Sequence, residues 1–210
     1  MNTTKTLQEY FNELSSNSPT PGGGNVAALC GALSASLGIM VCNLTIGKKK
    51  YVDVESEMIR LKEKIENLQK GFIELGQKDN ASFDKVMEAF KLPKETEQEK
   101  NLRAKAIEEA TIGATSAPME VIQSSKTLLP ILEIIIDKGN KNSLSDAGVA
   151  VALTRTAANS AYLNVLINCS SLSNQTIANE LKKTADILIE EVIRTSDRLF
   201  EQIVKAVQPK

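Results

Sequence analysis

Residues 21–47 read PGGGNVAALCGALSASLGIMVCNLTIG, and this stretch decides the fold. The prolines and glycines at and just before its start cannot continue a helix, so residues 18–24 are expected to form a loop. The apolar run that follows predicts a helix over residues 26–46, ended by Gly47. Because no charged residue occurs between Leu14 and Gly47, we expect this helix to be buried on all sides.

Small residues recur at every fourth position of this helix. They form two series, Ala27, Gly31 and Ala35, and Ala28, Ala32 and Ser36. Residues of this size at this spacing let a second backbone approach closely. A membrane span has a similar composition, but polar residues interrupt this run and the other predicted helices carry many charges. The sequence therefore favours a core helix and no membrane contact.

Further helices follow from apolar spacing and capping residues. We expect them over residues 5–15, from an Asp53 cap to about Phe90, over residues 96–139 with breaks or kinks at Pro118 and Pro130, and over residues 143–168 and 174–207. The β-branched run at residues 131–136 has no partner strand, so we interpret it as helical. The predicted fold class is all-α, an up-and-down helical bundle with long kinked helices, in a single domain of residues 1–210.

The helix over residues 143–168 is the second one with almost no charge. Between Ala147 and Asn179, only Arg155 is charged. Two such helices need more cover than the amphipathic helices of one small chain provide. We therefore predict a homodimer that buries one of these helices at its interface.

The composition excludes several classes of function. Lys and Arg number 25 and Asp and Glu number 26, so the net charge of −1 leaves no basic surplus for nucleic acid. The chain has no His, which excludes a Ser-His-Asp triad and His metal ligands, and proton transfer must use groups such as Asp or Lys. The three cysteines lack metal-binding spacing and are expected to be free thiols. The polar start of the sequence has no signal-peptide pattern, so we expect a cytoplasmic protein.

Three segments could carry chemistry. The glycines of residues 20–25 leave backbone bare for a ligand beside the N–H groups of a helix start, although a flexible entry loop is the alternative. The lysines of residues 47–51 could bind carboxylates, or could only complement a helix C-terminus. Residues 139–146 bring Asp146 to the tip of the second uncharged helix, where Ser143 and Asp146 also match a capping box.

Two carboxylates late in the long helix are further candidates. Asp79 and Asp84 point about 140° apart at ~100° per residue, so they cannot both face one site. Asp79 shares a helix face with Phe83, and we expect Asp79 to point inward.

Five stretches share their pattern with a known family. They are residues 21–28 (PGGGNVAA), 44–51 (LTIGKKKY), 79–94, 139–146 (GNKNSLSD) and 161–168 (AYLNVLIN). On these residues the sequence resembles the cyclodeaminase/cyclohydrolase family of folate enzymes, over nearly the whole chain and in the same order. One departure is Asn25, where the family commonly has Ser.

The resemblance implies an all-helical homodimer that binds a tetrahydrofolate derivative as substrate, with no metal and no redox cofactor. It implies one of two reactions. A cyclohydrolase adds water to methenyltetrahydrofolate to give formyltetrahydrofolate, whereas a cyclodeaminase closes formiminotetrahydrofolate and expels ammonia. We favour the cyclohydrolase, because no formiminotransferase domain accompanies this sequence. A folate-binding helical dimer without catalysis is the third possibility.

The resemblance and the residue chemistry together suggest roles. We expect Asp146 to be the base or electrostatic partner at the reacting carbon, Asp79 to be a second carboxylate at the amide-like edge of the pterin, and Lys48 to bind substrate or donate a proton. The residues expected to bind substrate are Pro21, Gly22, Gly23, Gly24, Asn25, Lys49, Asn140 and Asn164. These roles require Gly23 and Asp146 to meet at one cavity, within one chain or across a dimer.

Overall fold

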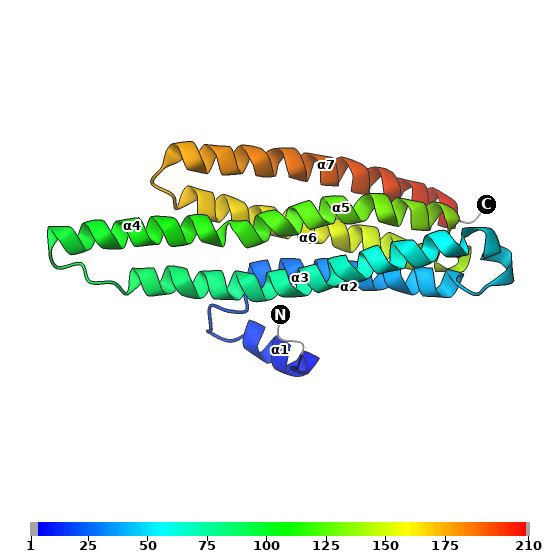
Figure 1. Cartoon of the computed structure of the whole chain (residues 1–210), viewed down its shortest axis with the longest axis horizontal. Helices are drawn as coiled ribbons and strands as arrows, with labels where there is room; N and C mark the ends of the chain where they lie inside the picture. The colour runs from blue at the N-terminus through cyan, green and yellow to red at the C-terminus, as the bar shows by residue number, and fades with distance from the viewer. Residues whose placement is uncertain (1–3, 209–210) are drawn as a thin grey trace.

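The computed structural model describes residues 4–208, which form helices and no strand (Figure 1). The α-helices are α1 (Leu7–Leu14), α2 (Gly23–Thr45), α3 (Glu55–Phe90), α4 (Glu97–Ala114), α5 (Ser116–Lys138), α6 (Leu144–Ser170) and α7 (Gln175–Val207). Short 3₁₀ turns, Lys49–Val54 and Lys141–Ser143, precede α3 and α6. The predicted all-α class with long helices is confirmed.

The long helices lie side by side in an elongated bundle, and α1 stands apart below it (Figure 1). Helices α2 and α6 are antiparallel neighbours. The Ser34 hydroxyl on α2 donates to the Ala150 carbonyl on α6 over 2.7 Å. At the far end of α2, the Asn140 N–H donates to Thr45 Oγ1 over 2.9 Å. The two uncharged helices of the sequence therefore pack against each other along most of their length.

Helix α2 is the centre of the packing, because it contacts α3 on one side and α6 on another. Its small residues face these neighbours, and Ala27, Gly31 and Ala35 are all buried. A Cβ placed on Gly31 would lie 2.4 Å from ring carbons of Phe72 on α3. The interpretation of the four-residue spacing is confirmed, since α3 comes this close only where α2 has no side chain.

Several helix starts differ from the prediction. Helix α2 begins at Gly23, so two of the glycines expected in the loop form its first turn. Asp53 does not cap α3, and Ser143 makes no capping bond at α6, so the predicted capping box with Asp146 is wrong. The cause is local, because a 3₁₀ turn leads into each helix. The N-cap of α3 (φ −110°, ψ 0°) and that of α6 (φ −107°, ψ 20°) are therefore not extended as a side-chain cap requires.

Other sequence signals are confirmed. Thr96 and Glu99 form a reciprocal capping box at α4, and the Asn174 side chain accepts from the first N–H groups of α7. Gly47 follows α2 with φ of 75°, a conformation that favours glycine. The cysteines are free thiols, and burial raises the pKa of Cys42 to about 11.

The prolines act differently from one another. The break between α4 and α5 is at Thr115, so Pro118 falls in the first turn of α5, where a missing N–H costs nothing. Pro130 lies inside α5. The segment at residues 131–136 is helical, as interpreted from the sequence.

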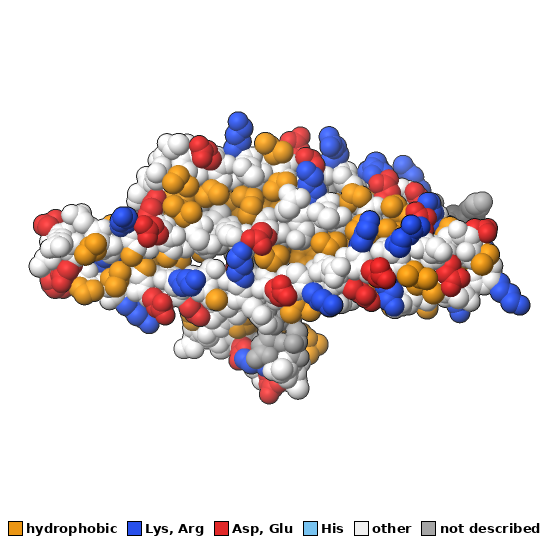
Figure 2. Space-filling model, viewed as in Figure 1, with side chains coloured by type: hydrophobic (Ala, Val, Ile, Leu, Met, Phe, Trp, Pro, Cys, Tyr) orange, Lys and Arg blue, Asp and Glu red, His pale blue; other side chains and the backbone are white. Residues whose placement is uncertain are grey.

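Charge is distributed unevenly over the surface. Lysines, arginines, aspartates and glutamates are interspersed on the face that carries α3, α4, α5 and α7 (Figure 2). Among the described residues, α2 is the one helix long and apolar enough to cross a membrane, but 56% of its most apolar 18-residue segment is buried within the bundle. Such burial is typical of a core helix.

We expect the Gly31→Ala variant to be destabilised by about 1–3 kcal/mol, because the new methyl group overlaps the fully buried Phe72 ring. The matched control is Gly71→Ala on α3, where a Cβ has no neighbour within 4 Å. That control should gain about 0.5–1 kcal/mol from helix propensity. Urea unfolding measures both values, and equal stability changes would contradict the packing argument.

Candidate functional site

A pocket of about 340 Å³ lies where the first turn of α2 meets α3, α4 and α6. This volume is within the range of small-molecule sites. The first turn of α2 and the loop before it contribute Pro19, Thr20, Gly22, Gly23 and Gly24, and the end of α6 contributes Asn164, Asn168 and Ser171. The opposite wall consists of Asp79, Phe83, Val86 and Phe90 from α3 and Ile107, Thr111 and Ala114 from α4. One wall is thus bare backbone with amide side chains, and the other is largely apolar.

Asp79 lies directly against the first turn of α2. A Cβ placed on Gly24 would meet the Asp79 carboxylate at 2.1 Å, so a side chain here would force the carboxylate to move. The carboxylate accepts the backbone N–H of Asn25. Asp79 therefore caps α2 from a different helix. Its carboxylate occupies the positive N-terminal end of α2, where the sequence analysis expected a ligand.

Burial shapes the chemistry of Asp79. Partial burial raises the pKa of its carboxyl above the ordinary value, and the Asn25 N–H opposes this by stabilising the ionised form. Asp79 is the only charged side chain among the described residues that line the pocket. Asp84 is exposed on another side of α3, as the sequence predicted. A half-buried carboxylate in an apolar pocket can accept N–H donors from a ligand or exchange a proton with it.

Other predicted residues of this end have separate positions. The Asn164 amide lies beside Gly23, 3.8 Å from where a Cβ would be, and its Nδ2 donates to the Ser160 carbonyl. The Pro21 ring and the Asn25 side chain are buried and are not among the residues lining the pocket. The Asn25 side chain thus packs beneath the first turn of α2, on the side away from the pocket.

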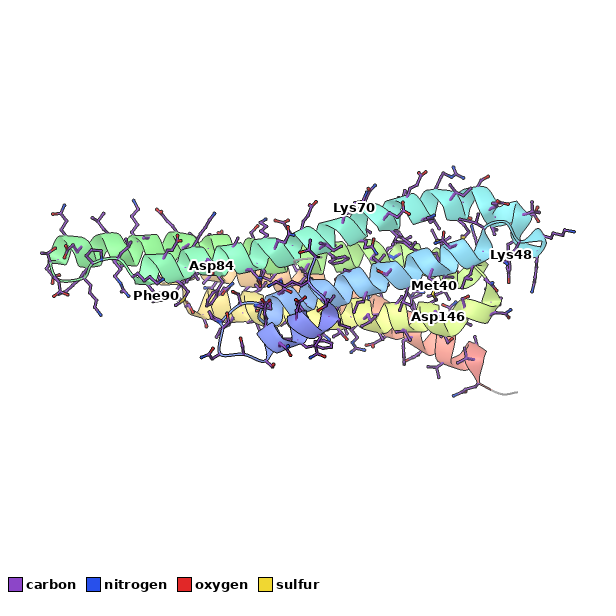
Figure 3. The ribbon with its side chains drawn as sticks, turned by 90° about the horizontal axis from the view of Figure 1, so that it is seen from below. Met40, Lys48, Lys70, Asp84, Phe90 and Asp146 are labelled. Carbon is purple, nitrogen blue, oxygen red and sulfur yellow. The ribbon has the colours of Figure 1, made fainter. Side chains whose placement is uncertain are left out.

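The remaining predicted residues lie toward the other end of the bundle. Figure 3 shows Lys48 and Asp146 there, with Phe90 and Asp84 at the opposite end. Asn140 ties α6 to α2, since its Nδ2 donates to the Leu44 carbonyl over 2.9 Å. Lys48 and Lys49 are exposed in the segment after α2. A partly exposed Asp146 accompanies them on the first turn of α6.

The distance between the two groups corrects one expectation. Ser34 pairs with Ala150 and Thr45 with Asn140, so Asp146 lies alongside residue 40 or so of α2. Seventeen residues at 1.5 Å each separate that level from Gly23, which is about 25 Å. Within one chain, Gly23 and Asp146 do not share a cavity. The two helices are antiparallel, and this orientation puts their N-terminal tips at opposite ends.

The sequence reasoning missed one wall of the pocket. Ile107, Thr111 and Ala114 recur at helical spacing on α4, which marks a face of that helix but not its partner. Phe83 and Phe90 lie one and three turns after Asp79 on the same face of α3. This spacing was the one sequence signal that these residues line the pocket with Asp79.

An uncharged surface runs along the outer sides of α2 and α6. We call it the α2/α6 face; it consists of Val26, Leu29, Leu33, Leu37, Met40 and Leu44 from α2 and Val149, Leu153, Thr156, Ser160, Leu163 and Ile167 from α6. Its large apolar side chains are well exposed, with Leu33 at 47%, Leu163 at 66% and Ile167 at 62%. Exposed apolar side chains along two neighbouring helices are typical of an interaction site.

Comparison with known proteins identifies a family of similar sequences and structures. The sequence model of the formiminotransferase-cyclodeaminase family matches residues 6–187. A methenyltetrahydrofolate cyclohydrolase from Methylorubrum extorquens is 40% identical over 203 residues, which cover 97% of this chain and 98% of that protein. The formimidoyltransferase-cyclodeaminase of Mus musculus is 32% identical over 185 residues, and this chain spans 34% of its length. The crystal structure of a formiminotetrahydrofolate cyclodeaminase from Thermotoga maritima matches with a TM-score of 0.80 at 34% identity, over 95% of this chain and 98% of that one.

We expect Asp79→Asn to increase the free energy of unfolding at pH 7. Because the folded-state pKa of Asp79 is raised, the native protein binds this proton more tightly than the unfolded chain does. Ionised Asp79 therefore lowers the free energy of unfolding at neutral pH. The increase in this free energy caused by Asp79→Asn should become smaller as the pH falls through the folded-state pKa, and should vanish below about pH 4. Asp84→Asn, on the exposed side of the same helix, is the control and should change little. Chemical unfolding at several pH values measures the difference, and a less stable Asp79→Asn protein at pH 7 would contradict it.

Proposed function

This chain belongs to the formiminotransferase-cyclodeaminase family, and we propose that it is a methenyltetrahydrofolate cyclohydrolase of one-carbon metabolism. The observation that carries the proposal is the 40% identity to a protein of that name along nearly the full length of both chains. The pocket supports it, because it combines bare backbone, a phenylalanine-lined wall and one carboxylate.

The reaction needs little more than an oriented water and a base. The methenyl carbon between the two folate nitrogens is cationic, so the oxygen of water adds to it while a base accepts a proton. The tetrahedral intermediate then breaks one carbon–nitrogen bond, and the released nitrogen takes a proton, which leaves the formyl product and one net proton. A carboxylate can serve as the base, which explains how a chain without His could catalyse this step.

The pocket fits the flat pterin end of such a substrate. The bare backbone of Gly22–Gly24 lets a ring approach one side, and Phe83 and Phe90 provide aromatic surface on the other. The Asp79 carboxylate can accept two N–H donors from the amide-like edge of the pterin. Asp79 also attracts the cationic methenyl ring electrostatically.

We infer that the enzyme works as a homodimer joined through the α2/α6 face. Five large side chains of this face are exposed to 40% or more, and the face carries no Lys, Arg, Asp or Glu. Most soluble oligomers are two-fold dimers in which the same patch of each copy meets its equal. A second copy is therefore the natural partner for this face.

A two-fold axis through this face would join the two halves of the site. The face extends from Val26 to Leu44 on α2, and its midpoint is at residue 35, between Leu33 and Leu37. A two-fold axis perpendicular to α2 at this midpoint pairs each residue with one at an equal distance beyond the midpoint. Gly23 of one copy therefore meets the level of residue 47 in the other copy. Asp146 and Lys48 belong to that end of the bundle (Figure 3). Each pocket would then receive the base from the second copy.

In this composite site the residues have distinct tasks. Asp146 activates water at the methenyl carbon, Lys48 and Lys49 pair with the carboxylates of the glutamate tail or return a proton, and Asp79 holds the pterin. Asn164 lines the pocket and hydrogen-bonds the ligand, whereas Asn140 joins the segment before α6 to the end of α2, at the end of the bundle that carries Lys48 and Asp146. No metal or redox cofactor is required by the bonds that form and break, and we expect the enzyme in the cytoplasm.

A formiminotetrahydrofolate cyclodeaminase is the second candidate. It is favoured by the match to the Thermotoga maritima structure of that title and by the family model. The same tetrahedral carbon forms there, but ammonia leaves in place of a folate nitrogen.

We expect the purified protein to consume methenyltetrahydrofolate, seen as loss of its near-ultraviolet absorbance. Appearance of the same absorbance from formiminotetrahydrofolate would instead identify the cyclodeaminase. Asp146→Ala should lower kcat/KM by about 100-fold or more while the protein stays folded, because general-base catalysis contributes that much. Asp84→Asn is the control with normal turnover. Near-normal turnover of Asp146→Ala would refute its assignment, and a protein inactive on both folates would refute the enzyme.

Subunit complementation tests the composite site. The Asp79→Ala and Asp146→Ala proteins should each be nearly inactive, and a reassembled equal mixture should regain about a quarter of wild-type activity. Half of the dimers are then mixed, and one of the two sites in each mixed dimer is intact. No recovery from a mixture that exchanges subunits would refute sharing between copies.

The interface variant Leu33→Glu should sediment as a monomer and lose activity, because it puts a charge near the midpoint of the α2/α6 face. Leu102→Glu, which is 60% exposed on α4, is the control and should remain a dimer. A wild-type protein that is monomeric at micromolar concentration would refute the dimer.

A further inference from the structure

A buried hydrogen-bond network lies directly behind the pocket, centred on Asn25. Its side chain is 1% exposed and has three partners from two other helices. Asn25 Oδ1 accepts from the Tyr10 hydroxyl on α1 over 3.0 Å. Asn25 Nδ2 donates to the Gly76 carbonyl over 2.8 Å and to Asn80 Oδ1 over 3.2 Å, both on α3.

The partners permit one arrangement of these groups. The Gly76 carbonyl can only accept, so Nδ2 of Asn25 must face it, and Oδ1 must face Tyr10. The Tyr10 hydroxyl is then the donor to Oδ1. If that hydroxyl were removed, Oδ1 would be a buried acceptor without this donor, and the amide could rotate away from α3.

The backbone of the same residue touches the site. The N–H of Asn25 donates to the Asp79 carboxylate in the pocket, one turn along α3 from Gly76. The side chain of Asn25 therefore fixes α2 against α3 at the point where its N–H meets Asp79. Gly24, one residue earlier, lies against the same carboxylate.

Tyr10 is the residue by which α1 reaches this network. It is 9% exposed, whereas Leu7 and Phe11 on the same helix are 64% and 50% exposed. Figure 1 shows α1 apart from the bundle, connected through the loop before α2. Most of the apolar surface of α1 is thus unburied, and the hydroxyl of Tyr10 is its specific polar contact with the site region.

We propose that Tyr10 is a positioning residue for the pterin-binding carboxylate: its hydroxyl orients the Asn25 amide, which holds the Asn25 N–H on Asp79. The proposal rests on the proposed function for the ligand. The linkage from Tyr10 to Asp79 rests on the side-chain hydrogen bonds of Asn25 and on the contact of the Asp79 carboxylate with the first turn of α2. The titratable groups that face the network are Asp79 on α3, Tyr10 on α1 and Cys30 on α2. Burial raises the pKa of both Tyr10 and Cys30 above their already alkaline ordinary values, so neither ionises at acid pH.

The test is Tyr10→Phe, which removes one hydroxyl and keeps the ring. We expect the KM for methenyltetrahydrofolate to rise about five- to tenfold with kcat within about twofold, because a weakened contact to the pterin affects substrate and transition state equally. The carboxyl-carbon NMR signal of Asp79 should titrate at higher pH than in the wild type, because the N–H that stabilises the ionised form is weakened. Tyr162→Phe is the matched control. It loses a tyrosine hydrogen bond of 2.6 Å to Asp186 and should change neither value.

A double-mutant cycle separates positioning from general stability. In an Asn25→Ala background, Tyr10→Phe should have no further effect on the Asp79 titration, because the intermediary is gone. An equal effect in both backgrounds, or an unchanged Asp79 titration in the single variant, would overturn the proposal. The NMR readout needs no turnover, so an enzyme inactive on both folates would refute the proposed function while the titration still decides the role of Tyr10.

Discussion

The close approach of α2 to its neighbours is the constraint on which the rest of the structure depends. Helix α2 has no charged side chain and presents glycine at its closest approaches to α3. At Gly31 this lets the Phe72 ring enter the core, and at Gly24 it lets the Asp79 carboxylate rest on the helix start. The same feature therefore builds the core at one level and the candidate site two turns earlier. A larger side chain at Gly31 would overlap the buried Phe72 ring, and one at Gly24 would displace the Asp79 carboxylate from the helix start.

The two uncharged helices also explain why a single chain holds only part of the expected site. A helix without charge must bury its sides, and α2 and α6 do so partly against each other. In an antiparallel pair, the starts of the two helices are far apart, so the glycine turn and Asp146 are separated by about 25 Å along α2. The outer sides of the same pair remain uncovered and apolar. The antiparallel packing of two uncharged helices thus separates the two parts of the site and also leaves an apolar surface exposed. Dimerisation through that surface would cover it and bring the two parts of the site together.

Much of the fold was predictable, because its signals are local. Apolar spacing and the caps at Thr96 and Asn174 fixed most helices to within a few residues. The predicted helix caps at Asp53 and Ser143 were wrong, because a 3₁₀ turn precedes the helix at both places. Whether such a turn forms depends on the packing around it. In the site, helical geometry correctly separated Asp79 from Asp84. The wall from α4 and the burial of Asn25 could not be predicted, because they depend on which helices become neighbours.

The position of Asp79 has a consequence for turnover. Its carboxylate faces the positive end of α2 through the Asn25 N–H and is the only charged group among the described residues of the pocket. An electronegative pocket of this kind attracts a ring that carries a positive charge and has less hold on a neutral one. In the proposed reaction, addition of water removes the charge from the folate ring system. The charge attraction that favours entry of the substrate would therefore disappear with the chemical step, and the pocket would hold the product less tightly than the substrate.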